Sequence, residues 1–287
     1  MKQLSTGLHK ICFSVIIPTY HRNDLLAKCL DRLAPGVQIL SAALYEVIVT
    51  DDGYQTTAEK MIRDRYPWVK WVVGLRKGPA ANRNNGTRYA KGEWLVFTDD
   101  DCLPSASWLL NFAEAITPDR DVYEGKTTCN AGIRSPLEHA PINLTGGYLW
   151  SCNMMIRVSL FHNLGGFDEN FPYPHMEDVD LRERIKLNGC LIKFVDNAVI
   201  DHPPQKNPLG YQLGAMHESE FYYWYQKKHQ QLSASYLLIS VIKGRLRLIL
   251  KCPKNRVTIL AIYQLIIEFI YVIMNANKWK KKYRIKC

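Results

Sequence analysis

The sequence contains no Cys-x-x-Cys pair, no internal repeat and no low-complexity segment. Its eight cysteines are scattered, and in a chain of 287 residues this pattern indicates buried or incidental thiols in a reducing compartment. The N-terminal segment also lacks the apolar stretch and the small-residue cleavage site of a signal peptide, so we expect a cytoplasmic protein. The composition, 47% apolar and 22% charged, excludes disordered and collagen-like classes and suits one large α/β domain or two small ones.

Acidic residues are nearly missing from one part of the chain. Residues 226–287 hold 14 Lys and Arg but one acid, Glu268, which gives a net charge of +13. The other 225 residues hold 23 basic and 26 acidic side chains and a net charge of −3, within a total of +10. The excess of basic residues therefore belongs to a C-terminal appendage, which argues against a nucleic-acid binder built around a basic core.

Short apolar runs alternate with helical patterns over the first hundred residues. Strands are expected at 13–17, 45–50, 69–73 and 94–98, and helices at 23–33, 57–66 and 80–91. Repeated strand–helix–strand units predict an α/β fold, with a mostly parallel sheet and helices on its faces. Ligands bind at the carboxyl ends of such strands. Three polar clusters are expected to meet there: Pro18-Thr19-Tyr20, Asp51-Asp52-Gly53 and Asp99-Asp100-Asp101.

Three adjacent carboxylates follow the apolar run 94–98. Asp99, Asp100 and Asp101 repel one another unless a cation or a proton intervenes. Hard divalent ions such as Mg²⁺ or Mn²⁺ favour carboxylate oxygens, and proteins usually hold them with one or two carboxylates together with substrate phosphates. The alternative is a solvated turn with an aspartate cap for a helix near Ser105.

Two other strand ends carry polar residues that have two interpretations each. Asp51 and Asp52 either accept hydrogen bonds from a nucleoside or form a β-turn with Gly53. His202, after a later apolar run, is either a structural histidine or the residue that completes a metal site made mainly of oxygens. None of these motifs is decisive when it is taken alone.

A helix is expected to begin near Asp178, because Leu181 and Ile185 lie at helical spacing and Gly189 supplies a stop. Its first turn would hold several carboxylates, which the helix dipole favours. They are either ordinary N-terminal caps or include a catalytic base. A base whose pKa the dipole lowers suffices only where a metal ion helps the leaving group to depart.

Six segments in fixed order resemble family-2 glycosyltransferases of the GT-A fold. They are FSVIIPTYHR, YEVIVTDDG, GPAANRNNGTRYAKGEWLVFTDDD, NMMIRVSLFHNLGGFDENF, EDVDLRERIKLNG and HPP, which span residues 13–204, about two thirds of the chain. The resemblance implies a GT-A catalytic domain over 1–225, a Rossmann-like α/β core with helices on both faces of a mostly parallel sheet. Its nucleotide-binding half would cover about 11–102 and its acceptor-side half about 103–225, followed by a helical appendage over 226–287.

The resemblance also implies roles for individual residues. The donor-binding set would be Pro18, Thr19, Tyr20, Arg22, Asp51, Asp52, Arg83, Asp99 and Asp100. A divalent metal ion, Mn²⁺ or Mg²⁺, would be held by Asp99, Asp101 and His202, with Asp101 as the more direct ligand. One departure from the family pattern is Asn85, which stands where a second arginine is expected after Arg83.

On the acceptor side, the resemblance implies that Asp178 is the catalytic base and Asp180 the alternative base. Glu177 and Trp150 would face the acceptor, and Gly146-Gly147 would belong to a flexible acceptor-side loop. The implied reaction is a single inverting displacement from a nucleotide-sugar, by preference a UDP-sugar, to a hydroxyl of a saccharide or glycolipid acceptor. Positive charge develops on the sugar as its bond to the diphosphate loosens, as in glycoside hydrolysis.

The implied setting is the synthesis of a bacterial cell-surface polysaccharide. Two alternatives remain open. One is transfer of the sugar to a polyisoprenyl phosphate, which clear membrane-spanning helices would support. The other is a catalytically inactive binding or scaffold protein with a GT-A core.

The basic appendage contains an apolar run, 257–274, that leads into KWKKKYRIK. As a helix this run would be about 27 Å long, slightly shorter than a hydrocarbon core of about 30 Å. Gln264, Glu268, Tyr271 and Asn275 form one polar stripe on it, so the pattern is amphipathic. We expect a helix lying at the inner face of the cytoplasmic membrane, held to acidic lipid by its flanking cations. Packing on the catalytic domain, an oligomer contact and a full span are the alternatives, and the interleaved aliphatic residues favour lipid over nucleic acid.

Overall fold

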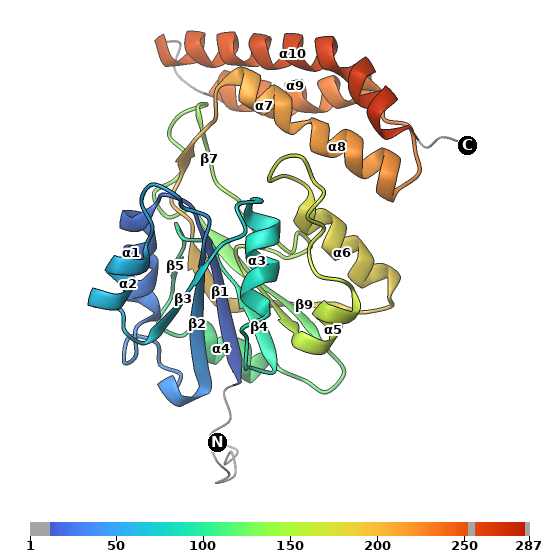
Figure 1. Ribbon diagram of the computed structural model, residues 1–287. Coiled ribbons are helices and arrows are strands. Elements are labelled where there is room, and N and C mark those ends of the chain that lie inside the picture. Colours follow the sequence, from blue (N-terminus) through green and yellow to red (C-terminus); the bar gives the residue numbers. More distant parts are fainter. Residues whose placement is uncertain (1–11, 252–255, 285–287) are drawn as a thin grey trace. The chain divides into compact units, whose positions relative to one another are not determined.

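The computed structural model describes residues 12–251 and 256–284 (Figure 1). They form two compact units. The first unit holds the described residues up to Asn130, together with Pro141–Glu169 and Leu181–Pro203; the second holds Ala131–Ala140, Asn170–Asp180 and the described residues from Pro204 onward. The expectation that the chain has no signal peptide concerns an N-terminal segment that lies mostly outside the described residues.

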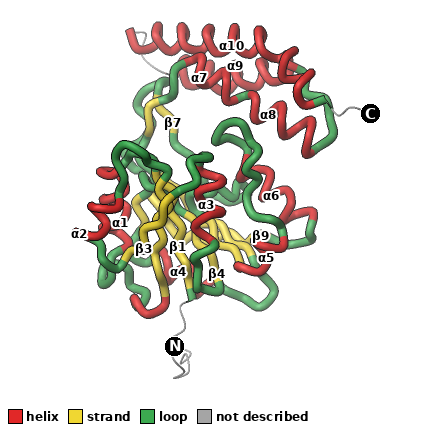
Figure 2. The backbone as a smooth tube through the Cα atoms, in the orientation of Figure 1, coloured by secondary structure: helices red, strands yellow, loops and turns green. Residues whose placement is uncertain are grey.

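The first unit is built on a mixed sheet that, within the described ranges, has eight strands in the order β3-β2-β1-β4-β8-β6-β9-β5. Figure 2 draws the strands in yellow. Strands β1 to β4 are parallel to their neighbours in that group, and β6 is parallel to β9. Strands β8 and β5 are antiparallel to the strands beside them. The strands are β1 (Phe13–Thr19), β2 (Tyr45–Asp51), β3 (Val69–Val73), β4 (Trp94–Phe97), β5 (Leu103–Pro104), β6 (Val122–Thr128), β8 (Met154–Arg157) and β9 (Ile192–Asp201).

Apolar clusters cover both faces of this sheet. Side chains alternate along a strand, so Val15 and Ile17 of the fully buried β1 join one cluster while Ile16 joins the other. The first cluster also takes side chains from α1 (Asn23–Leu33), α2 (Glu59–Arg65) and α4 (Trp108–Ala115). The second takes them from α3 (Pro79–Thr87), α5 (Val158–Asn163) and α6 (Glu177–Leu187). The expected α/β architecture, with helices on both faces of the sheet, is confirmed.

Three expected helices differ in their bounds. Helix α2 begins two residues later than expected and ends one residue earlier. Helix α3 ends at Thr87 instead of continuing to residue 91, because the amides of Tyr89 and Ala90 turn back to carbonyls three residues earlier. The helix expected near Ser105 begins only at Trp108, since the short strand β5 comes first and pairs with β9. Asp101 therefore does not cap a helix, and the capping interpretation of the three carboxylates is wrong.

The second unit contains a two-stranded ribbon and a group of helices. The ribbon pairs β7 (Glu138–His139) with β10 (Gln205–Lys206). The helices are α7 (Gly210–Met216), α8 (Glu218–Tyr222), the π-helical turn Tyr223–Lys227, α9 (Ala234–Lys251) and α10 (Arg256–Tyr283). Helix α7 packs closely on α10 at Gly214. A Cβ atom at that position would lie 2.8 Å from the Cβ of Tyr271, so only glycine fits without a shift. The expected C-terminal helical appendage is confirmed.

Candidate active site

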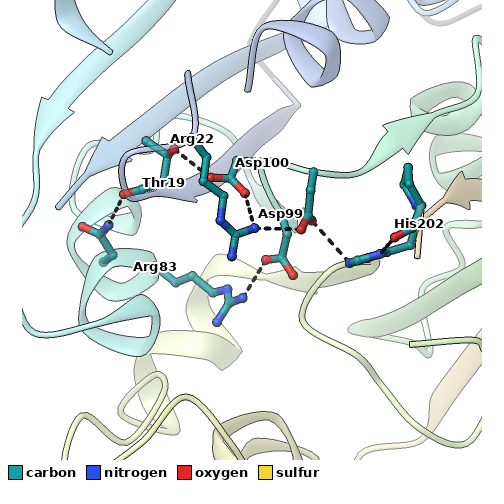
Figure 3. Close-up of polar contacts among 9 residues, drawn as sticks. Thr19, Arg22, Arg83, Asp99, Asp100 and His202 are labelled. Atoms are coloured by element: carbon teal, nitrogen blue, oxygen red, sulfur yellow. Dashed lines mark hydrogen bonds and ion pairs between the residues drawn. The ribbon is translucent and has the colours of Figure 1, made fainter. Parts of the chain in front are cut away.

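The carboxyl ends of two neighbouring parallel strands bring the first group of side chains together (Figure 3). Thr19 ends β1 and Asp100 follows β4, and the Thr19 hydroxyl donates to Asp100 Oδ2 at 2.7 Å. The Arg22 guanidinium lies between two acids, 3.2 Å from Asp100 Oδ1 and 2.8 Å from Asp101 Oδ2. Both carboxylates are buried. The structure therefore gathers Thr19, Arg22, Asp100 and Asp101 at one edge of the sheet.

Burial has the largest effect on the ionisation of Asp100. It raises the pKa of this carboxyl to about 7, against the lowering effect of Arg22, and the charge of Asp101 adds to the rise. Asp100 is therefore near its midpoint of ionisation at neutral pH. Arg22 favours the ionised form, so the charge of this edge depends on where that guanidinium lies.

Asp101 and His202 form a pair that fits a metal ion. The ring Nδ1 of His202 donates to the carbonyl of Pro203 at 3.0 Å, which leaves Nε2 as the ring nitrogen that faces Asp101. That Nε2 lies 3.3 Å from Asp101 Oδ1, a buried oxygen that has no hydrogen-bond partner within the described part of the chain. A carboxylate oxygen and an imidazole nitrogen that face each other in this way are suitable ligands for a divalent cation.

Sequence analysis missed one neighbour of this pair. The candidate ligand atoms of Asp101, Cys102 and His202 all lie within 4.8 Å of one another. Burial raises the pKa of the Cys102 thiol well above its ordinary value. A protonated thiol is a poor ligand for Mg²⁺ or Mn²⁺, which prefer oxygen. The position of Cys102 directly after the three carboxylates was the signal in the sequence.

Asp99 has a different partner from the one expected for a metal ligand. Its Oδ1 accepts a hydrogen bond at 2.6 Å from the guanidinium of Arg83, which α3 carries (Figure 3). Arg83 is buried and also lies over the ring of Phe167, 5.6 Å from its centroid. Asn85, which replaces the expected second arginine, donates instead to the carbonyl of Val73 at 3.0 Å. Two of the predicted donor-binding residues, Asp99 and Arg83, are thus held together.

The two carboxylates at the end of β2 hold backbone loops. Asp51 accepts hydrogen bonds from the amides of Gly53 at 2.8 Å and Ala58 at 2.6 Å. Asp52 accepts one from the amide of Gly78 at 3.0 Å, and burial raises the pKa of Asp52 although its amide bonds lower it. The turn interpretation therefore holds for Asp51, and contact with a nucleoside stays a prediction for both residues.

Exposed aromatic rings lie beside these loops. Tyr20 and Tyr54 are both exposed, with ring centroids 6.3 Å apart, and His21 packs against each of them. Flat exposed rings of this kind suit stacking against a nucleobase. Pro18 lies one step back in β1, opposite Thr50. Sequence analysis predicted a role for Tyr20 but missed Tyr54, which directly follows the Asp-Asp-Gly turn.

The predicted base lies at the start of α6, in the second unit. The helix begins at Glu177, one residue before the expected start, and Met176 precedes it with a positive φ of 79°. Asp178 Oδ1 accepts from the Val179 amide at 2.8 Å. Glu177 and Asp180 are buried, whereas Asp178 is partly exposed. Of the three acids in this turn, Asp178 is therefore the one best able to meet a substrate.

A buried glutamate organises the predicted acceptor-side loop. The Glu124 carboxylate accepts from the amides of Gly147, Tyr148 and Leu149 and from the Asn143 side chain. Three residues of the loop have positive φ values: Gly146 (84°), Gly147 (99°) and Leu149 (51°). Sequence analysis missed Glu124, whose only signal was a lone acid within the strand-like run of β6.

The same loop presents two stacked aromatic rings. The Tyr148 and Trp150 rings lie 5.1 Å apart with 17° between their planes. Tyr148 is exposed and Trp150 is half-buried. A flat ring face with a polar edge is a suitable surface for a sugar ring, and the acceptor-side role of Trp150 stays a prediction.

Comparisons with known proteins give a consistent assignment. The family model described as glycosyl transferase family 2 matches residues 14–165. Chondroitin synthase of Escherichia coli is 24% identical over 278 residues, which cover 77% of this chain and 40% of that protein. The chain spans about half the length of the curated relatives it matches, or less.

Two solved structures are similar along most of the chain. The mannosyltransferase PcManGT from Pyrobaculum calidifontis, in complex with GDP-Man and Mn²⁺, has a TM-score of 0.57 and 17% identity, covering 93% of this chain and 76% of that one. S. aureus TarS 1-349 in complex with UDP-GlcNAc has a TM-score of 0.56 and 17% identity, covering 96% of this chain and 93% of that one.

These structures confirm the GT-A fold expected from the six sequence segments. The matched region runs from β1 to the end of α5 and includes the strand ends that carry Asp51 and Asp99. The chain belongs to glycosyl transferase family 2.

Proposed function

We propose that this protein is a metal-dependent inverting glycosyltransferase that moves a sugar from a nucleotide-sugar to a hydroxyl of a saccharide or glycolipid acceptor. The observation that carries the proposal is the buried pair of Asp101 Oδ1 and His202 Nε2, 3.3 Å apart beside Asp100 and Arg22. The proposed transfer would take place in the synthesis of a cell-surface polysaccharide, and the similarity to chondroitin synthase supports this. Residues 1–225 would be the catalytic domain.

Residues at the ends of β1, β2 and β4 would hold the donor. The exposed rings of Tyr20 and Tyr54 would stack on the base, with Asp51 and Asp52 nearby for its polar groups. Arg22 and Arg83, which now pair with the carboxylates that follow β4, carry the positive charge that a diphosphate needs. Uridine is the proposed nucleoside, supported by the UDP-GlcNAc complex of TarS.

Asp101 and His202 would hold a divalent cation, Mn²⁺ or Mg²⁺, with Asp99 as a further carboxylate. The Mn²⁺ in the mannosyltransferase structure supports this assignment. When bound, such an ion neutralises negative charge on the departing diphosphate. The buried Asp101 oxygen, which lacks a hydrogen-bond partner among the described residues, is the most suitable first ligand.

Asp178 would take the proton of the attacking acceptor hydroxyl. Its partly exposed carboxylate lies in the first turn of α6, where the helix dipole favours negative charge. Glu177 would face the acceptor, and Trp150 with Tyr148 would receive its sugar ring. The direction of attack, opposite to the departing diphosphate, would give inversion.

The basic helical appendage, residues 226–287, would hold the enzyme at the inner face of a bacterial cytoplasmic membrane as a peripheral protein. Helix α10 is the one helix in the described ranges that has the length and hydropathy of a membrane span, with a mean hydropathy of 2.2 over its most apolar window. The net charge of +13 supports contact with acidic headgroups.

Thermal unfolding in the presence of UDP-, GDP- and dTDP-sugars, each with Mn²⁺ and with EDTA, tests the donor and the metal ion together. We expect a UDP-sugar to raise the melting temperature when Mn²⁺ is present and to have little effect with EDTA. Stabilisation by a GDP-sugar alone would mean that the donor carries guanosine instead of uridine. No stabilisation by any nucleotide-sugar would contradict the proposed function.

A further inference from the structure

The polar stripe of α10 faces the protein, opposite to the orientation expected for an amphipathic helix on a soluble protein. Gln264 accepts a hydrogen bond from the Gly210 amide at the start of α7. Glu268 is 2% exposed, and its oxygens lie 2.9 Å from His217 Nε2 and 3.3 Å from Arg245 Nε. The polar side chains that would normally meet water are therefore already occupied within the second unit.

The apolar side of the same helix faces outward. Its exposed side chains recur three or four residues apart, which places them on one face. We call this set the outer face of α10: Ile259, Ile262, Tyr263, Ile266, Ile270, Ile273 and Met274, which are 43–75% exposed. Soluble proteins rarely expose a contiguous apolar surface of this kind unless it binds something.

Cations lie at both ends of the outer face. Arg256 is exposed at the N-terminal end of α10, and Lys278 and Lys281 are exposed at the C-terminal end. Residues 226–287 contain no acid except Glu268, which is buried. The outer face of α10 is therefore apolar in the middle and positive at each end, and among the described residues the one acid near that C-terminal end that pairs with the helix, Glu218, binds Lys282 and not Lys278 or Lys281.

We propose that the outer face of α10 is a docking surface for an anionic lipid bilayer, with the helix lying in the plane of the interface. The apolar middle matches the acyl region, and the cations match acidic headgroups. A second copy of the chain would instead bring the exposed cations of two such helices together. This inference rests on the membrane location in the proposed function and names the surface responsible.

The inward contacts also decide between lying in the interface and crossing the bilayer. A spanning α10 would have to separate Glu268 from His217 and Arg245 and carry its carboxylate into hydrocarbon. The exposed apolar stretch from Ile259 to Met274 covers about 24 Å of helix, less than a hydrocarbon core of about 30 Å. Both observations favour a helix that stays packed on α7 and binds lipid with its outer face.

Co-sedimentation with vesicles tests the proposal on the full chain without donor or acceptor. The protein should pellet with vesicles of phosphatidylcholine mixed with phosphatidylglycerol, and much less with phosphatidylcholine alone. The double variant Ile266→Asp/Ile270→Asp should bind the mixed vesicles at least about tenfold more weakly, because it places two carboxylates in the acyl region. Lys278→Gln/Lys281→Gln should weaken binding to the mixed vesicles and reduce its dependence on salt.

Leu187→Asp/Leu191→Asp is the matched control, because both leucines are exposed but belong to the first unit. It should bind vesicles like the wild type. Equal binding by the Ile266/Ile270 variant would overturn the proposal. A different result would also overturn it: the wild type is a dimer in sedimentation velocity, the Ile266/Ile270 variant is a monomer, and neither protein pellets with vesicles. Stabilisation by nucleotide-sugars is measured without lipid, so the proposed transferase function and this docking surface can fail separately.

Discussion

Replacing Glu124 with glutamine tests how the acceptor-side loop is held. One carboxylate oxygen accepts from the Gly147 amide, and the other accepts from Asn143, Tyr148 and Leu149. Glutamine has the same size but one acceptor oxygen, which can keep the second group while its amide NH₂ faces the Gly147 N–H. The Gly147 N–H, whose contact with Glu124 is partly buried, then loses its acceptor, at about 1–3 kcal/mol, and the remaining bonds lose their charge assistance. We expect a total loss of about 2–4 kcal/mol of unfolding free energy.

Denaturant unfolding measures this loss, and hydrogen exchange locates it. The amides of Gly147 and Leu149 should exchange faster in Glu124→Gln than in the wild type, whereas amides of β1 should change only by the global loss of stability. Glu93→Gln is the control, because Glu93 makes an exposed ion pair with Arg157 and should cost less than about 1 kcal/mol. Equal stability and unchanged exchange in Glu124→Gln would refute the idea that this carboxylate organises the loop.

The remaining predictions concern catalysis and pH. Asp178→Asn should abolish sugar transfer with nearly unchanged donor affinity, while Asp180→Asn should retain transfer; the reverse result would make Asp180 the base. Burial lowers the pKa of His217, but its hydrogen bonds to Glu220 and Glu268 outweigh this and raise it to about 9. A raised histidine pKa stabilises the fold fully below about pH 6.5, and this contribution disappears as the pH rises through 9. Burial raises the pKa of Glu220, but hydrogen bonds with His175 and His217 outweigh it and lower it to about 2, so its contribution is lost only as the pH falls through that value. The unfolding free energies of wild type and His217→Gln should therefore differ most near pH 6, by on the order of 2 kcal/mol, and converge above pH 9. Melting temperatures measured across this pH range follow the difference, and parallel curves of melting temperature against pH would exclude this ion pair.

The sequence predicts the strand ends well because burial on both faces leaves a clear pattern. Strand β1 is buried at every position, and helix α1 has the bounds expected from its spacing. The meeting of Thr19 with Asp100 follows from the adjacency of β1 and β4 in a parallel sheet. Residues carried by regular elements could therefore be placed from their order in the chain.

Long-range pairings could not be predicted in the same way. Asp99 binds Arg83, and Arg22 lies between Asp100 and Asp101, because of side-chain packing that periodicity does not report. A lone acid such as Glu124 gives no sign of where its hydrogen-bond donors lie.

The orientation of α10 could not be predicted either. The amphipathic pattern shows that α10 has a polar side and an apolar side, but it does not show which side the rest of the protein covers. Glu268 faces inward because His217 and Arg245 are there to pair with it. Their position depends on the packing of α7 and α9, which the sequence of α10 does not contain.

The most direct test of metal-dependent transfer is the release of nucleoside diphosphate from the stabilising nucleotide-sugar, compared between the wild type and Asp101→Asn. We expect release by the wild type with Mn²⁺ or Mg²⁺, loss of release with EDTA, and at least about a hundredfold lower rate in Asp101→Asn, whose amide removes a negative ligand. Release that is insensitive to both EDTA and the substitution would contradict it.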